Sequence, residues 1–422
     1  MIKIFSIYVV VLVTVFAATA QPLTTNFTPE SAVSAALENN RDLVAARLAI
    51  RQAEGRLKQA GLWANPEWET SYAPDTVFAN AGEYSFTTGF KQRFPITGRL
   101  GKAKAVARVD VEMAVTEIHN QERLLTGDVL TRVRELLVLR QQLQANQEVQ
   151  DTLGKLVTMS ERRVKVAEVS EADVNLARIE LQKAQLSRQT LLVGQTTATV
   201  ALNQLLGREP KTPLEILGQP PMDFNADAIA EAEGKALTRR PDRQLAALSI
   251  NRSAAEIKLA RAEKWEDWTV GLNYSRDEQK FVAPVGDQRG EFLGLSVSIP
   301  LPFWNRNQGK ISEVQAGQQR AGAELNALDL RIAAEMQTAG ERLRQLSDIL
   351  RQYREQSLKL AQDNVALMQK GYTDGLVNIT AVVQAQQQSI GLRLNYLETL
   401  ADFERALTDW QTATASFSSD QK

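Results

Sequence analysis

Two stretches of the chain, each more than 100 residues long, contain no proline. They run from Ile96 to Glu209 and from Phe303 to the C-terminal Lys422. Because a proline inside a helix costs about 3 kcal/mol, such stretches permit helices far longer than those of a compact domain. Apolar residues recur in them at intervals of three and four, as in segment 172–181. We therefore expect two helices of about 65 residues, over 103–167 and 310–374, each about 100 Å long.

Shorter helices are expected beside these long ones, over about 28–62 and 170–206, from the same apolar spacing. Each is about half as long as a 65-residue helix. Two short helices placed end to end beside one long helix would fill a uniform layer. The sequence therefore predicts an elongated molecule.

Aromatic residues gather in two windows where the apolar period changes to two. Of 26 aromatic residues, eight fall between Trp63 and Phe94 and seven between Trp265 and Trp304. The alternation predicts strands of about 9–11 residues with one apolar and one polar face, in hairpins at about 66–95 and 268–301. The expected polar face carries Glu67, Glu69, Ser71, Glu83, Ser85, Lys91 and Arg93. The aromatic residues expected to form girdles at a membrane interface are Trp68, Tyr72, Tyr84, Phe86, Phe90, Phe94, Trp268, Tyr274 and Phe292.

The two halves of the chain are similar in sequence and in the order of their expected elements. A shift of 200 residues aligns Asp42 with Asp242, and a shift of 208 aligns Val169 with Val377. We interpret this as an internal duplication. The domains expected from it are a signal peptide at 1–20, a first repeat at 21–206, a proline-rich connector at 207–225, a second repeat at 226–416 and a tail at 417–422.

The N-terminus has the pattern of an export signal. Lys3 is followed by an almost wholly apolar run over 4–17, and Ala18-Thr19-Ala20 fits a small-x-small cleavage site. No second apolar run of about 18 or more residues follows, which excludes a polytopic inner-membrane protein. We expect cleavage and a mature chain outside the cytoplasm; the alternative is an uncleaved N-terminal anchor.

The composition argues against much enzyme chemistry. The chain has no cysteine and one histidine, His119, so thiolate sites, disulfides and histidine-rich metal clusters are excluded. Lys and Arg number 49 against 50 for Asp and Glu, so no global basic field points to nucleic acid. We expect no catalytic residue, no cofactor and no resident metal.

The four expected strands cannot close a membrane barrel alone, because the smallest single-chain barrels need about eight. Open sheet edges are not tolerated in lipid, so several copies would have to contribute to one barrel. The alternative is a soluble sheet with one solvated face.

Four segments are similar to the TolC-like outer-membrane efflux family: 35–43, 60–67, 94–102 and 299–309. The last of these, together with Trp63-Ala64-Asn65-Pro66, resembles most its cobalt–zinc–cadmium (CzcC-type) branch. The resemblance implies a mainly α fold with a small β part, in which long antiparallel helices form an α-barrel. It also implies a homotrimer with a twelve-stranded barrel in outer-membrane lipid of a Gram-negative bacterium. The implied partners are a periplasmic adaptor protein and a resistance-nodulation-division inner-membrane pump.

The turns between helices correspond to the periplasmic tip of that family, where the adaptor binds. The tip residues implied by the resemblance are Ala167, Val169, Ser170, Gly375, Leu376, Val377 and Asn378. Ala167 stands where the family usually has glycine, and Ala381 where aspartate is common. Four acidic residues near the turns are candidates for a gate or a cation-attracting ring: Glu168, Glu171, Asp173 and Asp374. The alternative for each is a solvated helix end.

The expected function is a passive export duct that is driven by a partner pump. The branch resemblance favours divalent heavy-metal cations, with drug efflux and type I protein secretion as alternatives. Since the chain has almost no soft ligands, selectivity for metals would lie mainly in the partners. A different class of function, a secreted coiled-coil scaffold or adaptor with a soluble β domain, remains open.

Overall fold

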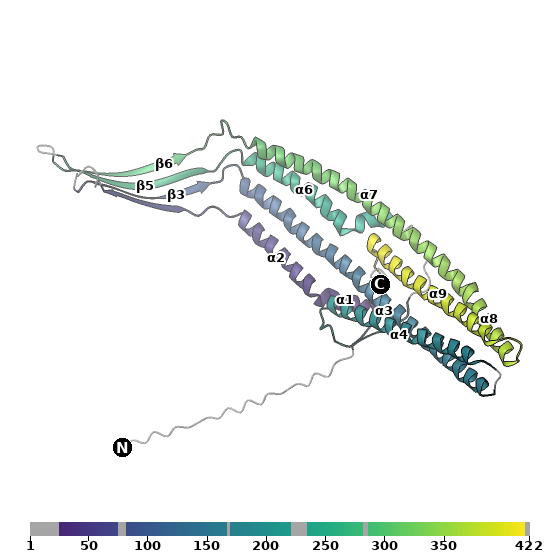
Figure 1. The fold of residues 1–422 in the computed structure, drawn as a ribbon. Coiled ribbons are helices and arrows are strands. Elements are labelled where there is room, and N and C mark those ends of the chain that lie inside the picture. The colour runs from purple at the N-terminus through teal and green to yellow at the C-terminus, as the bar shows by residue number, and fades with distance from the viewer. Residues whose placement is uncertain (1–24, 75–81, 167–168, 221–233, 282–285, 418–422) are drawn as a thin grey trace, which may run out of the picture.

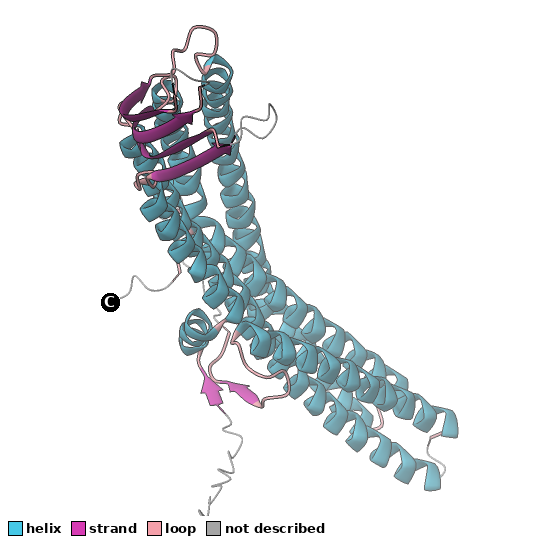
Figure 2. Ribbon diagram, turned by 90° about the vertical axis from the view of Figure 1, so that its left-hand side faces the viewer, coloured by secondary structure: helices cyan, strands magenta, loops and turns pink. Residues whose placement is uncertain are grey.

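The protein is a bent rod of helices with a small sheet at one end (Figures 1 and 2). The computed structural model describes residues 25–74, 82–166, 169–220, 234–281 and 286–417. The mainly α fold with a small β part is confirmed. The expected signal peptide at 1–20 lies outside the described residues, as do the end of the connector and all of the tail except Phe417.

The first half of the chain contains four helices: α1 (Pro29–Asn39), α2 (Arg41–Ala60), α3 (Arg99–Lys165) and α4 (Glu171–Leu205). The long helix α3 has 67 residues, which agrees with the length permitted by the proline-free stretch. The single helix expected over 28–62 is wrong. It is broken at Asn40, whose backbone is extended with ψ 121°, so the chain starts a new helix there.

The second half contains α6 (Pro241–Ala262), α7 (Gln308–Gln352), a π-helical turn (Tyr353–Ser357), α8 (Leu358–Thr373) and α9 (Ile379–Thr414). Residues 234–239 are also helical. The chain is therefore helical over the whole of the expected long helix at 310–374 up to Thr373, with a π-helical turn between its two α-helical parts. A π-helical turn inserts one residue into the helical repeat, so it changes which side chains face the neighbouring helix.

The helices form one layer in which long helices run beside pairs of short ones. Helix α3 packs against α2 and α4 along one side and against α6 and α9 along the other. Helix α7 in turn packs against α6 and α9, and α8 continues beside α9 toward the turns (Figure 1). Buried apolar side chains hold α3, α7 and α9 together, among them Val138, Leu343 and Phe403.

Asn40 lies where the start of α2 meets the end of α4, and we call this place the first joint. Its side-chain oxygen accepts from the Leu43 backbone N–H at 2.9 Å and so caps the start of α2. Its amide nitrogen donates to the Leu205 carbonyl at 2.9 Å, at the last turn of α4. One buried side chain therefore satisfies a free backbone donor of α2 and a free backbone acceptor of α4.

Replacing Asn40 by alanine is expected to lower the free energy of unfolding by about 1–2 kcal/mol, because a cap and a cross-helix hydrogen bond are lost together. The neighbouring Asn39 is exposed and donates only to Ala35 of its own helix. Asn39→Ala is therefore the matched control, with an expected change within about 0.5 kcal/mol. Urea unfolding of the purified protein in detergent measures both, and equal effects would contradict the role given to Asn40.

Four strands form an antiparallel sheet in the order β2-β3-β5-β6. They are β2 (Glu67–Pro74), β3 (Tyr84–Phe94), β5 (Trp268–Gln279) and β6 (Gln288–Ser298). One hairpin comes from each half of the chain, and β3 pairs with β5 to join them. Strands β2 and β6 are the two edges of this sheet.

A second, two-stranded sheet was not expected from the sequence. Strand β1 (Thr25–Phe27) pairs in parallel with β4 (Leu214–Ile216), which lies inside the connector expected at 207–225. Phe27 and Ile216 are buried in one apolar cluster with Val133 of α3 and Leu202 of α4. The connector therefore packs along the middle of the rod and ties the start of the described chain to it (Figure 2).

Within the described part of the chain, no helix is both long enough and apolar enough to cross a membrane.

Candidate functional site

One face of the four-stranded sheet is apolar over most of its height. The register sets Trp68 beside Phe90, Phe90 beside Leu272, and Leu272 beside Leu295. Because side chains alternate across a strand, residues of one row and every second residue along each strand share this face. The face carries Trp68, Tyr72, Tyr84, Phe86, Phe90, Phe94, Trp268, Val270, Leu272, Tyr274, Leu293, Leu295 and Val297. We call it the apolar sheet face.

At the end far from the helices, the same face is charged on β5 and β6, in the rows where β2 and β3 carry Tyr72, Phe86 and Tyr84. Arg276 lies opposite Glu291, and Glu278 lies opposite Arg289 at 3.2 Å. These cross-strand ion pairs mark the border of the apolar band at the end of the sheet far from the helices.

Phe292 does not belong to the apolar sheet face. It is in register with Ser275, which is in register with Thr87, and all three lie on the opposite face. The expectation that Phe292 joins the other aromatic residues is corrected for this reason. The period of two already contains this signal, because Phe292 precedes Leu293, Leu295 and Val297 by odd numbers of residues.

The opposite face is polar and carries small residues. Arg93 donates to Glu67 at 2.8 Å, and Lys91 pairs with Glu69. At the base of the sheet, the Arg99 guanidinium holds the Asp267 carboxylate through two hydrogen bonds. These groups line a cleft that opens between the sheet and the helices. This face is hydrophilic where the sheet meets the helices.

The turn between α8 and α9 is a closed Schellman motif. Gly375 has φ +77°, its N–H donates to Tyr372 at 3.2 Å, and the Leu376 N–H donates to Gly371 at 2.7 Å. Asn378 then caps α9 by accepting from the Ala381 N–H at 3.0 Å. Glycine suits the left-handed position because it has no Cβ, so the turn reverses the chain in few residues.

The turn between α3 and α4 ends in a matching cap. Ser170 and Asp173 form a capping box, in which the Ser170 hydroxyl accepts from the Asp173 N–H at 3.3 Å. The Asp173 carboxylate in return accepts from the Ser170 N–H at 3.1 Å. Ser170 and Asn378 are related by the shift of 208 residues, so both repeats start their returning helix with a cap at the same place.

The structure brings the two turns together around an open groove of about 630 Å³. Five of the predicted tip residues line this groove: Val169, Ser170, Gly375, Val377 and Asn378. Arg163 joins the two hairpins, because its guanidinium lies 4.1 Å from the centre of the Tyr372 ring and donates to the Tyr372 carbonyl at 3.2 Å. Predicted residues Ala167 and Glu168 lie outside the described residues.

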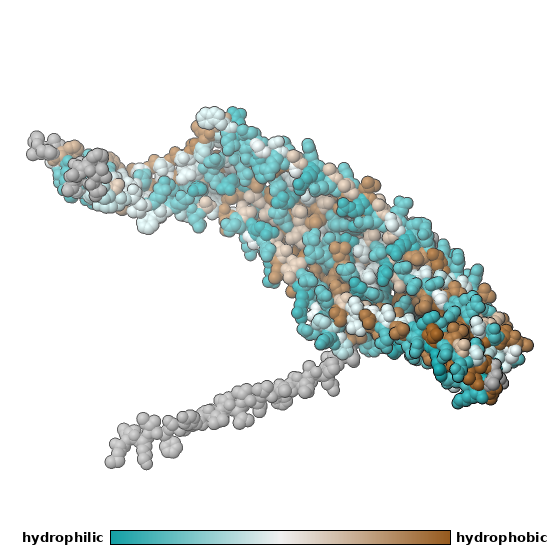
Figure 3. Space-filling model, viewed as in Figure 1, coloured by the Kyte–Doolittle hydropathy of each residue, from teal (hydrophilic) through white to brown (hydrophobic). Residues whose placement is uncertain are grey.

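Leu376 does not line the groove but lies in the same turn, where its side chain is 79% exposed. Val166, at the end of α3, is exposed too. Apolar surface gathers at this end of the molecule (Figure 3). The tip therefore presents apolar side chains to solvent beside a buried apolar cluster that includes Tyr372 and Ile379.

The predicted acidic residues of the tip divide into two kinds. Glu171 and Asp374 are exposed, and Asp374 is the C-cap that follows α8, with its N–H donating to the Lys370 carbonyl. Asp173 is half-buried and its carboxylate serves the capping box. Asp173 therefore has a structural role, and of the three predicted acidic residues that the structure describes, Glu171 and Asp374 are the exposed ones.

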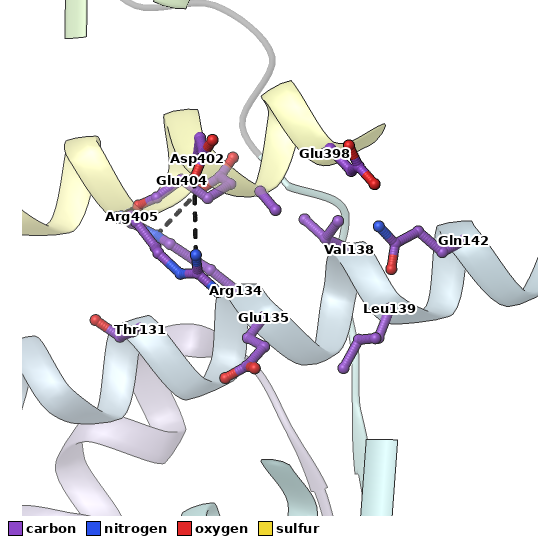
Figure 4. Close-up of a pocket in the computed structure, with 11 residues that line it drawn as sticks. Thr131, Arg134, Glu135, Val138, Leu139, Gln142, Glu398, Asp402, Glu404 and Arg405 are labelled. Carbon is purple, nitrogen blue, oxygen red and sulfur yellow. Dashed lines mark hydrogen bonds and ion pairs between the residues drawn. The ribbon is translucent and has the colours of Figure 1, made fainter. Parts of the chain in front are cut away.

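A buried ion pair lies between α3 and α9, near the middle of the rod (Figure 4). Arg134 Nε is 3.4 Å from Glu404 Oε2, and both side chains are at least nine-tenths buried. Arg134 also donates to the Thr408 hydroxyl at 2.6 Å and to the Gln411 amide oxygen at 2.9 Å. Burial raises the pKa of Glu404 to about 7, although the attraction of Arg134 partly opposes it.

Glu404 gives the fold a pH dependence with a defined sign. The unfolded carboxyl ionises near pH 4.5, whereas the folded one holds its proton to about pH 7. The raised pKa contributes stability below pH 4.5, and that stability is lost as pH rises to about 7. Glu404→Gln is expected to match the wild type at pH 5 and to exceed it by about 2–3 kcal/mol at pH 8. A stability difference that is equal at both pH values, measured by urea unfolding, would contradict this.

The second joint, where the start of α6 meets the end of α9, contains a network of charged side chains. Arg240 is buried at the start of α6 and donates to Asp242 at 2.6 Å, to Glu335 at 2.7 Å and to the Ala413 carbonyl at 3.2 Å. Arg123 of α3 donates to the Thr412 carbonyl at 2.7 Å. Burial opposes ionisation of Asp242, but the hydrogen bond and charge of Arg240 outweigh it and hold its pKa below the usual range.

These buried charges are not among the residues predicted from the sequence. Arg240-Pro241 does contain a signal, since proline is favoured at the first position of a helix and marks a start there. Nothing in the spacing indicates that Arg134 and Glu404 meet, because they lie 270 residues apart. Among the described residues, no group of three or more His, Cys, Asp or Glu side chains could hold a metal ion.

Comparison with known proteins gives a consistent result. A family model described as outer membrane efflux protein matches residues 32–208 and 234–416. The two matched segments cover each half of the chain separately, in agreement with the internal duplication inferred from the sequence.

Two named relatives cover most of the chain. The cobalt-zinc-cadmium resistance protein CzcC of Cupriavidus metallidurans is 25% identical over 393 residues, which are 90% of this chain and 88% of that protein. The pyoverdine export outer membrane protein OpmQ of Pseudomonas putida is 25% identical over 411 residues, with 90% and 85% covered. A crystal structure of CusC shares the fold, with a TM-score of 0.74 at 19% identity over 92% of this chain and 91% of that chain.

Proposed function

The chain belongs to the outer membrane efflux protein family, and from that premise we propose that it is the outer-membrane duct of a tripartite efflux system. It assembles as a homotrimer and passes substrates that a periplasmic adaptor and an inner-membrane pump deliver. The single observation that carries the proposal is the sheet: one mainly apolar face, one polar face and two edge strands.

The dimensions of the apolar sheet face suit a membrane. On β3 the aromatic residues from Phe86 to Phe94 extend over eight residues, or about 26 Å, and on β5 and β6 the charged pairs begin at the level of Phe86. The apolar band of outer-membrane barrels is about 25 Å tall, with aromatic residues at both borders. Four strands cannot close, and open edges are not tolerated in lipid, so several copies must share one barrel. Membership of the efflux family favours three copies with twelve strands.

The polar sheet face then lines the water-filled duct, and the helices continue it through the periplasm. The groove between the two turns, with exposed Leu376 beside it, is where the adaptor binds. Glu171 and Asp374 face the aqueous opening in three copies each and attract cations. Ala167 and Glu168 belong to the same tip by sequence.

Replacing Leu376 by aspartate is expected to abolish efflux while the trimer persists, because a charge in an apolar contact must be desolvated. Leu360 of α8 is 73% exposed and lies away from the turn, so Leu360→Asp is the matched control. Resistance of a strain carrying each variant is measured beside the amount of trimer in its outer membrane. Full resistance with Leu376→Asp would remove this residue from the adaptor contact.

The substrates of this duct are divalent heavy-metal cations. Support comes from the CzcC relative, which is named for cobalt, zinc and cadmium resistance. The chain itself has few soft ligands, with no cysteine and one histidine, so it conducts ions that its partners select. Export of organic compounds is the second candidate, and the equally similar pyoverdine exporter favours it.

Deleting the protein from its host separates these substrates. We expect the deletion strain to become more sensitive to zinc, cobalt, cadmium, copper or silver, and to recover when the intact chain is supplied. Unchanged metal tolerance together with greater sensitivity to drugs would overturn the metal assignment but keep the duct. A protein found in the soluble periplasmic fraction would instead support the secreted scaffold.

A further inference from the structure

Two loops at the base of the sheet expose aromatic and aliphatic side chains that the proposed duct has not used. We call residues 61–66, between α2 and β2, the entry loop, and residues 299–307, between β6 and α7, the exit loop. In the entry loop Leu62 and Trp63 are each 58% exposed. In the exit loop Leu301 and Phe303 are exposed, and Trp304 is 89% exposed. Large apolar side chains gathered in this way on ordered loops usually mark a contact surface.

Both loops hold their exposed rings in defined positions. Trp63 packs edge to face on Phe94 with the ring centres 5.8 Å apart, and the Ala64 carbonyl accepts from Gln92 at 3.0 Å. In the exit loop the Phe303 and Trp304 rings pack edge to face at 6.1 Å. The rings are therefore ordered before any partner binds, which lowers the entropic cost of a contact.

The backbone of the exit loop is fixed as well. Asn307 takes a left-handed conformation with φ +58°, and its amide donates to the Ala260 carbonyl at 2.8 Å. Gln308 donates to the Trp304 carbonyl at 3.2 Å. A non-glycine residue at positive φ is held by its surroundings, so the loop is built to present Trp304 outward.

The two loops lie at the same end of the sheet but at opposite edges (Figure 1). Strand β2 starts at Glu67 beside the entry loop, and β6 ends at Ser298 beside the exit loop. Both strands are edges, and they run in opposite directions. If β6 of one copy pairs with β2 of the next, the strand ends at the helix side become neighbours, with strands about 4.8 Å apart.

We propose that the exit loop of each protomer packs against the entry loop of the next, so that Phe303 and Trp304 cover Leu62 and Trp63 of the partner. The partner is a second copy of this chain. The contact forms a clasp at the base of each seam between sheets, just below the apolar sheet face. This inference rests on the proposed trimer, and it adds the contact that locks neighbouring sheets in register.

The absence of native cysteine makes cross-linking a direct test. Leu62→Cys and Leu301→Cys are combined in one chain, and the protein in outer membranes is treated with a short bis-maleimide. Covalent dimers and trimers are expected, and each single variant should stay monomeric in denaturing gels. Leu62→Cys with Leu376→Cys is the matched control, because these positions lie at opposite ends of the rod.

The assembly of the untreated protein, measured by sedimentation in detergent, distinguishes the two proposals. Trimers that yield no covalent product with the Leu62 and Leu301 pair would overturn the clasp and keep the duct. Untreated protein that sediments as a monomer would overturn the proposed trimer itself, and the clasp with it.

Lipid is the other possible occupant of these loops, and fluorescence tests it. The intact protein and Trp304→Phe are reconstituted in vesicles of brominated phosphatidylcholine, and the difference in emission gives the quenching of Trp304. The clasp predicts little quenching of this residue. Loss of most of its emission would place Trp304 in lipid and overturn the proposal.

Discussion

Replacing Leu295 by arginine is expected to remove the assembled trimer from the outer membrane. Leu295 is 74% exposed and lies in the middle row of the apolar sheet face, beside Leu272. An arginine at the middle of the lipid-facing surface of a barrel costs about 2–4 kcal/mol, and three copies would carry it in one barrel. The amount of trimer that resists sodium dodecyl sulfate in outer-membrane fractions measures the effect.

Ser296→Arg is the matched control for this experiment. Ser296 is the next residue of the same exposed strand, but its side chain lies on the polar face. The same added charge should therefore face water, and the trimer should persist near the wild-type amount. Equal loss with both variants would indicate damage to the edge strand rather than a lipid-facing surface. Normal assembly with Leu295→Arg would contradict the membrane assignment of the apolar sheet face.

Replacing Arg240 by alanine is expected to lower the free energy of unfolding by about 3–5 kcal/mol. The substitution leaves the Asp242 and Glu335 carboxylates without their closest cation and the Ala413 carbonyl without its donor. Arg123 remains 3.8 Å from Asp242 and compensates only in part. Because the joint between α9 and α6 depends on Arg240, hydrogen exchange should rise at the ends of these two helices first.

Arg243→Ala provides the control for charge alone. Arg243 pairs with Asp329 at 2.7 Å, but both side chains are about one-third exposed. The expected loss is about 0–1 kcal/mol, as for other pairs at a surface. If Arg240→Ala and Arg243→Ala destabilise the protein equally in urea, the buried network does not carry the joint.

The long helices and the sheet could be predicted because each follows from one simple pattern. Proline is absent over the whole of α3, and the period of two places Leu293, Leu295 and Val297 on one face. Both patterns act within a single element, so a single sequence contains them in full. The same rule places Phe292 on the other face, because its position along β6 and not its aromatic ring decides which face it joins.

Interactions between distant segments could not be predicted in this way. The residue type of Asn40 is typical of a helix cap, but its second hydrogen bond, to the Leu205 carbonyl, joins residues that are 165 positions apart. Strands β1 and β4 have three residues each, too few to show a period. Arg134 and Glu404 look like solvated helix charges until α3 and α9 are packed together. Burial is a property of the assembled layer, and it decides the chemistry of these groups.

The two halves of the chain use different side chains at the corresponding joints between helices. Asn40 and Arg240 are related by the shift of 200 residues, and each begins a helix while donating to the last turn of the helix stacked on it. Asparagine does this with one neutral amide, whereas arginine needs two carboxylates around it. The two joints are therefore similar in geometry and different in chemistry.

Electron cryo-microscopy of the protein extracted from outer membranes tests the proposed duct. We expect a threefold particle in which four strands from each of three copies close one barrel, with β6 of each copy paired antiparallel to β2 of the next. The apolar sheet face should lie in the detergent belt, and the turns at 166–170 and 373–378 should lie at the far end. A particle in which the edges of β2 and β6 stay unpaired, or in which the polar face meets the detergent, would contradict it.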